Sequence, residues 1–324
     1  MRHGDDGPDG GPWPSDTGDM PEDPSANNTR WRPRVPWRVS DIVAAVFLNV
    51  AAVFTITSAI ATSDRLRQAE SASGIISVLV TALVAAALVA GIARLSKLPL
   101  STTVLVVAGA TIAGVFLAAL STTGTSDGDL AGLPVTVLQF AVLEGVFLAT
   151  ALLYSIVKFK TPFTSLGFVQ TAGVRYLQGF GAWALALVGV VVWGLVVEQT
   201  GVESLQPPES AEDVLDLAGG SIFLAWLLVG ALGPIAEEVF FRGFMLGGLR
   251  RRLGPWPAIV ASSAVFAAFH IDPGALVPTF LLGLALGWVY LKSRSIWPSI
   301  FVHGLHNTLA LVLASQADRI MEAA

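Results

Sequence analysis

The sequence predicts an all-α, polytopic transmembrane helical bundle with about 8–9 membrane segments and a disordered N-terminal tail. Of its 324 residues, 53% are hydrophobic and only 13% are charged, against about 25% charged in a soluble domain. The apolar residues form runs of roughly 18 or more, which suit membrane-crossing helices and not the alternating strands of a membrane barrel. Cysteine is absent, which excludes thiolate chemistry, and no basic face points to nucleic acid as a partner.

Residues 1–38 differ from the rest of the chain in composition. They contain seven Pro, five Gly and seven acidic residues without apolar periodicity, so they cannot bury enough surface to offset the entropy of ordering. We therefore expect a disordered cytoplasmic tail here and N-terminal transmembrane helices over 39–160. A second helical domain over 161–315 and a short C-terminal tail over 316–324 complete the predicted organisation.

Nine apolar segments account for the predicted membrane region. The seventh is short for a full span, which tilt or shielding by neighbouring helices would allow. In chain order the segments are about 42–62, 75–94, 102–121, 134–157, 178–198, 221–247, 256–270, 276–292 and 296–314.

The charges of the loops predict an orientation. The basic stretch 30–38 before the first segment and the loops after the even-numbered segments carry 14 of the 19 basic residues. Because Lys and Arg accumulate on the cytoplasmic side of a membrane, we expect a cytoplasmic N-terminus and an external C-terminus. The tail does not resemble an organelle import signal, which favours a multi-pass protein of a bacterial plasma membrane, in contact with membrane lipids.

Ionisable residues within the sixth segment are the first candidates for chemistry, because charges in membrane segments are costly and usually functional. Glu238 and Arg242 are spaced i, i+4 and can pair on one helix face. Glu237 points about 100° away from Glu238, which leaves it available as a general base or acid. Pro234 is expected to kink the helix and to free a carbonyl just before the two acids.

Three of the four histidines lie in the last 55 residues. Phe266 and His270 share one face of the seventh segment. In the ninth segment His303 and Asn307 are one turn apart and can point at one spot, whereas His306 lies on a neighbouring face. Either histidine alone could be a hydrogen-bonded packing residue, but the combination with an acidic pair favours a common site.

Two other features fit structural roles. Glu144, an isolated acidic residue of the fourth segment, is expected to be a helix-packing residue and not a catalyst. Gly283 and Gly287 form a small-residue spacing that predicts close contact between two helices.

Together these residues resemble the CAAX prenyl endopeptidase and bacteriocin-processing family, also called the Abi or CPBP intramembrane proteases. The family pattern consists of Glu-Glu-x-x-x-Arg, Phe-x-x-x-His and His-x-x-x-Asn in that order. Here the three motifs begin at Glu237, Phe266 and His303. The resemblance covers roughly 165–315, and it makes 161–315 a CPBP/Abi-type intramembrane protease domain.

The resemblance also implies roles for individual residues. Glu237 and His270 would activate a water molecule, and His303 and Asn307 would stabilise the oxyanion. The acid–arginine pair of the sixth segment would support the helix. A zinc ion held by Glu237, His270 and His303 would suit water activation equally well, so the zinc-dependent and the metal-free mechanism both stay open.

The leading interpretation is a CAAX protease-like intramembrane endopeptidase, with or without a metal. It would hydrolyse a peptide or a membrane-anchored protein substrate with water activated by glutamate and histidine. One alternative is a catalytically silent immunity or chaperone protein of the same fold, which a degenerate motif would have favoured. Another is a transporter that uses the buried charges as an ion pathway. The intact motif favours the enzyme.

Deletion of residues 1–29 is expected to leave hydrolysis of a short peptide unchanged, because this part of the tail lies outside the resemblance and its composition predicts disorder. Turnover by the purified truncated protein, compared with the full chain, measures the effect. A large fall would show that the tail contributes to catalysis.

Overall fold

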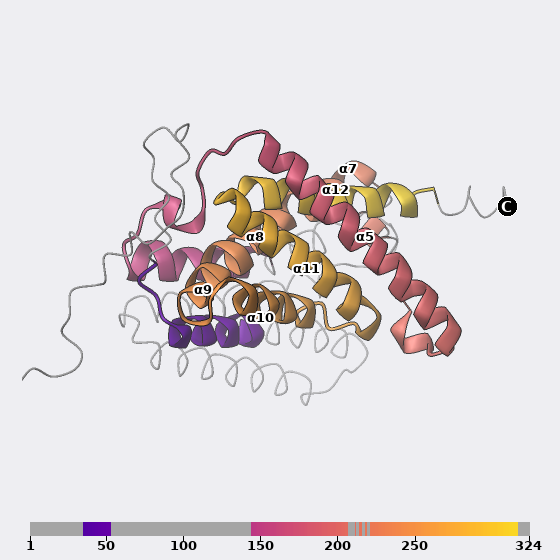
Figure 1. Ribbon diagram of the computed structural model, residues 1–324, viewed down its shortest axis with the longest axis horizontal. Coiled ribbons are helices and arrows are strands. Elements are labelled where there is room, and N and C mark those ends of the chain that lie inside the picture. Colours follow the sequence, from indigo (N-terminus) through magenta and orange to yellow (C-terminus); the bar gives the residue numbers. More distant parts are fainter. Residues whose placement is uncertain are drawn as a thin grey trace, which may run out of the picture. The chain divides into compact units, whose positions relative to one another are not determined.

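The computed structural model describes residues 35–52, 144–206 and 221–316, with four single positions between 211 and 218. All regular secondary structure in these ranges is helical (Figure 1), which confirms the predicted fold class. The predicted second and third segments lie outside the described residues, as do nearly all of both tails. The count of eight or nine spans therefore stays a prediction.

Two π-helical stretches, η4 and η5, interrupt one long helix that runs over Ile222–Leu253. η1 is also π-helical, and η2 and η3 are short 3₁₀ helices. In chain order the elements are a helix over Val39–Ala52, a helix over 144–152, η1 (Leu153–Lys158), η2 (Phe163–Leu166), α5 (Val174–Thr200), η3 (Glu203–Leu205), α7 (Ile222–Ala225), η4 (Trp226–Leu232), α8 (Gly233–Glu238), η5 (Val239–Leu246), α9 (Gly247–Leu253), α10 (Pro255–Ala268), α11 (Pro273–Ser293) and α12 (Trp297–Ala314).

Three of the described helices are long and apolar enough to cross a membrane: α5, Ile222–Leu253 and α11. They correspond to the predicted fifth, sixth and eighth segments. α10 has 14 residues, in agreement with the prediction of a short seventh segment. Along α5, Leu177 and Leu185 are 72% and 73% exposed, as expected of a helix surface that faces lipid instead of water.

Pro234 explains how α12 is attached to the long helix. Because proline has no N–H, the carbonyl of Val229, five residues earlier, lacks its partner in the π-helical hydrogen-bond pattern. The side chain of Asn307 donates its Nδ2–H to this carbonyl at 2.7 Å. The predicted release of a carbonyl before the acid pair is thus confirmed, and its acceptor role ties α12 to η4.

Glycines allow the close approach of the helices around the site. A Cβ atom on Gly304 would lie 2.7 Å from the carbonyl oxygen of Gly230, so only glycine permits this contact between α12 and η4. Between α10 and α11, a Cβ on Gly283 would lie 2.9 Å from the Cβ of Ser263. A Cβ on Gly287 would lie 3.1 Å from Ile259. The small-residue contact predicted for this helix pair is therefore confirmed.

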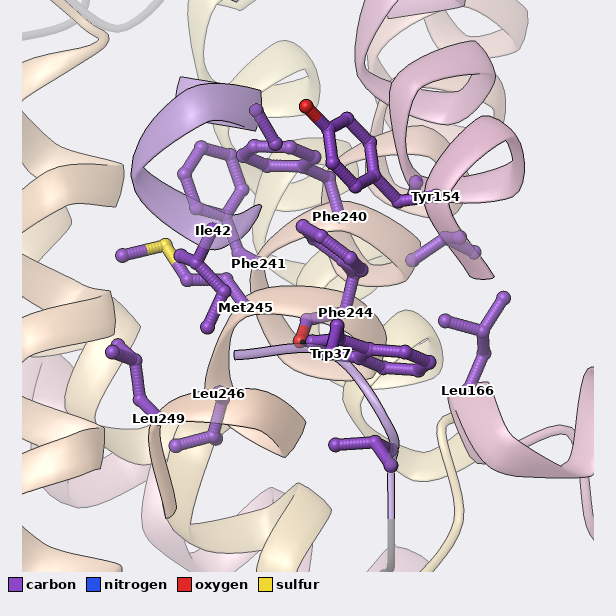
Figure 2. Close-up of a cluster of buried hydrophobic side chains, with 14 of the residues drawn as sticks. Trp37, Ile42, Tyr154, Leu166, Phe240, Phe241, Phe244, Met245, Leu246 and Leu249 are labelled. Carbon is purple, nitrogen blue, oxygen red and sulfur yellow. Dashed lines mark hydrogen bonds between the residues drawn. The ribbon is translucent and has the colours of Figure 1, made fainter. Parts of the chain in front are cut away.

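An aromatic core packs around η5 (Figure 2). All eight residues of η5 are buried. The ring of Trp37 stacks on Phe244 with centroids 5.1 Å apart, and its Nε1–H donates to the Phe244 carbonyl at 2.9 Å. Tyr154 contacts the same Phe244 ring at 5.5 Å. An ion pair between Asp41 and Lys158 adds a polar link. The aromatic contacts hold the segments around Trp37 and Tyr154 against the helix that carries the acid pair, and the ion pair joins these two segments to each other.

Gly304→Ala is expected to lower the melting temperature in detergent, because the new methyl group meets backbone and not a movable side chain. The cost of such overpacking is about 1–3 kcal/mol. Gly194→Ala on α5 is the matched control, since its Cβ would meet nothing within 4 Å and alanine favours helix. Equal melting temperatures for the two variants would contradict the close contact between α12 and η4.

Candidate active site

The predicted pair of Glu238 and Arg242 forms in the core of the molecule. Glu238 Oε1 lies 2.8 Å from Arg242 Nη1, and the two side chains are 0% and 1% exposed. The guanidinium also lies over the ring of Phe266, 4.3 Å from its centroid, where cation and aromatic face attract each other. Because both charges are out of contact with solvent, removal of either partner would leave the other uncompensated.

His303 of α12 joins this pair. Its Nδ1 atom lies 3.0 Å from Glu238 Oε1. A carboxylate ionised by its pairing with Arg242 can only accept, so the proton of this hydrogen bond belongs to His303 Nδ1. Glu238 therefore fixes the orientation and the tautomer of the histidine, beyond the predicted support of its own helix. No local spacing in the sequence signals this contact, because 65 residues separate the two partners.

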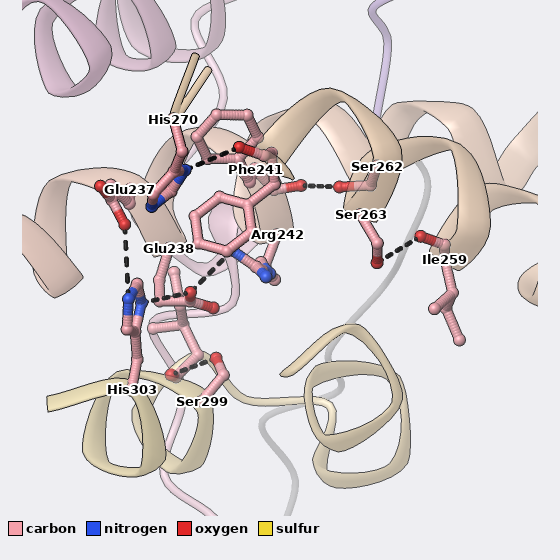
Figure 3. A network of polar contacts seen from close by, with 12 residues as sticks. Glu237, Glu238, Phe241, Arg242, Ile259, Ser262, Ser263, His270, Ser299 and His303 are labelled. Carbon is pink, nitrogen blue, oxygen red and sulfur yellow. Dashed lines mark hydrogen bonds and ion pairs between the residues drawn. The ribbon is translucent and has the colours of Figure 1, made fainter. Parts of the chain in front are cut away.

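Glu237 lies on the other side of the same imidazole ring. Its Oε2 atom is 3.4 Å from His303 Nε2, and its side chain is 16% exposed whereas that of Glu238 is fully buried. Since Nδ1 already carries a proton, a favourable contact here requires one further proton between Nε2 and Oε2. Figure 3 shows the resulting chain of contacts, which runs from Arg242 through Glu238 and His303 to Glu237.

His270 lies beyond the end of α10 and not within its last turn as expected. α10 ends at Ala268, and the next residue after the histidine, Ile271, has a left-handed backbone with φ of 60°. His270 is exposed, and its Nδ1 lies 3.0 Å from the carbonyl of Phe266. That carbonyl can only accept, so Nδ1 carries the proton of this hydrogen bond and Nε2 is the ring nitrogen that does not take part in it.

The ring of Phe266 contacts both histidines of the candidate site. The rings of His270 and His303 pack edge-on against it, with centroid distances of 5.0 and 5.7 Å. The prediction that Phe266 and His270 share a face is therefore confirmed. The hydrogen bond of His270 goes to the Phe266 carbonyl, so the two histidines meet through an aromatic ring and not through a polar contact.

Asn307 and His303 contact the long helix at two different points and not at one spot. His303 reaches α8, whereas the amide of Asn307 is held at the Val229 carbonyl that proline leaves free. His306 faces α5, where Trp183 Nε1–H donates to its Nδ1 at 3.3 Å. The structure thus brings Glu237 together with His303 and the buried ion pair, places His270 nearby and gives Asn307 a structural bond.

The arrangement of the site also bears on the zinc alternative. Within the described ranges, no group of three or more His, Cys, Asp or Glu side chains has the arrangement of a metal site. Both ring nitrogens of His303 already face carboxylates. Glu237, His270 and His303 as placed do not fit a three-ligand zinc centre, so no step of the chemistry is routed through a metal.

Residues 219–309 match the Rce1-like family of type II CAAX prenyl endopeptidases. The matched region holds all the motif residues described above, from the acid pair of α8 to Asn307, and it confirms the resemblance seen in the sequence. The match to this membrane-protease family and the three long apolar helices together support a membrane protein.

Three curated relatives are similar to the chain over part of its length. The candidate membrane peptidase YdiL of Bacillus subtilis is 26% identical over 153 residues, which are 46% of this chain and 61% of the relative. Protein YxdF of Lactococcus lactis is 26% identical over 135 residues, 41% of this chain and 73% of the relative. An uncharacterized 24.3 kDa protein of Escherichia coli is 27% identical over 156 residues, 47% and 69% of the two chains. No solved structure is significantly similar to the chain.

Arg242→Ala is expected to destabilise the protein more than Glu237→Gln. The first change strands Glu238 in the core, and breaking a buried ion pair in this way costs about 3–5 kcal/mol. The second change keeps the volume of a partly exposed side chain. Melting temperatures in detergent compare the two variants, and equal values would contradict a buried, supporting ion pair.

Proposed function

We propose that the protein is an intramembrane endopeptidase that hydrolyses a peptide bond of a peptide or of a membrane-anchored protein. The observation that carries the proposal is the partly exposed carboxylate of Glu237, placed against a histidine whose ring is oriented by a buried ion pair. The Rce1-like match over 219–309 supports the same activity class. The prenylated CAAX substrates in the name of that family are not assigned to this chain.

In the proposed reaction, Glu237 removes a proton from water, and the resulting hydroxide attacks the carbonyl carbon of the scissile bond. The tetrahedral oxyanion needs a hydrogen-bond donor. The Nε2 position of His303 supplies one when it carries the proton shared with Glu237. Glu237 then gives the proton that it took from water to the leaving amine, as peptide hydrolysis requires. The Nε2 atom of His270, an exposed residue that packs against Phe266, is available to orient the attacking water.

This proposal differs in one respect from the roles that the family resemblance implied. His303 contacts the general base directly, and Asn307 is engaged by a backbone carbonyl. We therefore assign oxyanion stabilisation to His303 and a positioning role to Asn307. A zinc requirement stays a separate prediction, tested by whether a chelator removes activity.

Location and alternatives follow from the same features. We propose a plasma-membrane location with the N-terminus in the cytoplasm, on the basis of the basic loops and the positive-inside rule. The silent immunity or chaperone alternative is less favoured because the motif is intact. The transporter alternative is less favoured because the charged groups from Arg242 to Glu237 contact one another, and all of them belong to the peptidase-like motif.

Glu237→Gln is expected to leave the protein folded and inserted in the membrane but to abolish peptide cleavage, since glutamine keeps the volume and loses the base. Turnover of a fluorogenic peptide by the purified variant measures the loss. Glu198→Gln, the same substitution at an exposed position of α5, should keep wild-type turnover. Wild-type turnover in Glu237→Gln would refute the assignment of the base.

A further inference from the structure

A second carboxylate approaches Glu237 from another helix. Phe147 of the helix over 144–152 contacts Phe240 of η5 with ring centroids 5.3 Å apart. Each of these rings lies three residues after an acidic residue, Glu144 on one helix and Glu237 on the other. Residues three apart share a helix face, so the contact between the two rings brings the two acidic residues towards each other. Glu144 therefore lies beside the proposed base.

Further contacts support this register. Further along both segments, Tyr154 contacts Phe244 with ring centroids 5.5 Å apart. The two segments therefore run in the same direction. Phe147 also packs edge-on against Phe269, with centroids 5.1 Å apart, and Phe269 directly precedes His270. The aromatic contacts thus hold the Glu144 helix against η5 and against the residue before His270.

Glu144 has no compensating charge among the described residues. Its Oε2 atom is buried and makes no hydrogen bond there. The cation of the candidate site, Arg242, is paired with Glu238. Two acidic residues close together beside an aromatic core are unfavourable unless a cation or hydrogen-bond donors lie between them. An unpaired buried carboxylate oxygen therefore points to a ligand that supplies positive charge.

We propose that Glu144 determines substrate specificity by binding a basic side chain, lysine or arginine, next to the scissile peptide bond. The inference rests on the proposed endopeptidase function and extends it to a substrate class. A lysine ammonium has three donors and an arginine guanidinium five, enough to satisfy the buried Oε2 atom and to approach Glu237. Binding there would place the neighbouring carbonyl beside the base.

The test uses fluorogenic peptides and the full chain reconstituted in liposomes. In a peptide that the wild type cleaves, lysine, norleucine or glutamate is placed in turn at each position around the scissile bond. Wild-type kcat/KM should favour lysine over norleucine by roughly tenfold or more at one position, as expected of a hydrogen bond to a charged group. In Glu144→Gln this ratio should fall to near one, and Glu144→Lys should favour the glutamate peptide instead.

Two controls separate specificity from a structural role. Glu198→Gln should keep the wild-type preference, and Glu144→Asp, which retains the charge, should keep a preference for lysine. No preference for lysine at any position, or an unchanged preference in Glu144→Gln, would overturn the inference while leaving the endopeptidase proposal intact.

A binding measurement covers the case in which no peptide is cleaved, which would refute the proposed function itself. Fluorescence anisotropy of the lysine and norleucine peptides with Glu237→Gln gives their affinity ratio without chemistry. Tighter binding of the lysine peptide that disappears when Glu144→Gln is added would support the specificity role. Equal affinities would overturn it.

Discussion

The Oε1 atom of Glu238 contacts two side chains. One is Arg242, one helical turn further along the same long helix, and the other is His303 on α12. The geometry of the candidate site depends on this buried atom. Arg242 keeps the carboxylate ionised, the carboxylate keeps the proton on Nδ1 of the histidine, and the other ring nitrogen is thereby directed at Glu237. The same logic of an acidic residue that orients a histidine operates in well-known hydrolytic triads, here built on membrane helices.

Backbone chemistry brings α12 close enough for this contact. Pro234 leaves the Val229 carbonyl without its usual donor, and Asn307 satisfies it. One turn earlier, Gly304 allows α12 to touch the Gly230 carbonyl, and His303 is the residue before this glycine. The π-helical turns on either side of α8 are a common feature of functional sites in helices. The irregular backbone thus positions the histidine as directly as the ion pair does.

Local patterns predicted the parts of the site that depend on helical periodicity. The Glu238–Arg242 pair and the shared face of Phe266 and His270 follow from spacings of four residues. A common site for Glu237 and His303 was expected, but the contact of His303 with Glu238 was not, because it depends on how α12 crosses the long helix. The position of His270 outside α10 was missed because the left-handed Ile271, a β-branched residue in a backbone region that favours glycine, gives no sequence signal.

The proximity of Glu144 to Glu237 was missed for the same reason as the contact of His303 with Glu238. An isolated acidic residue in an apolar segment is expected to pack against a neighbouring helix, and only the register set by Phe147 and Phe240 places it beside the base. The match to the Rce1-like family does not include this residue, since it begins at residue 219. The fold class and the motif could therefore be read from the sequence, whereas the neighbours of the motif required the helix packing.

The most direct test of this account is the tautomer of His303. The chain has four histidines, so nitrogen NMR of ¹⁵N-histidine-labelled protein in lipid gives a simple spectrum, in which a His303→Asn variant identifies the relevant ring. The account predicts a protonated Nδ1 in the wild type and loss of that fixed state in Glu238→Ala. An unprotonated Nδ1 in the wild type would contradict it, because Glu238 could then not be the acceptor that orients the histidine towards Glu237.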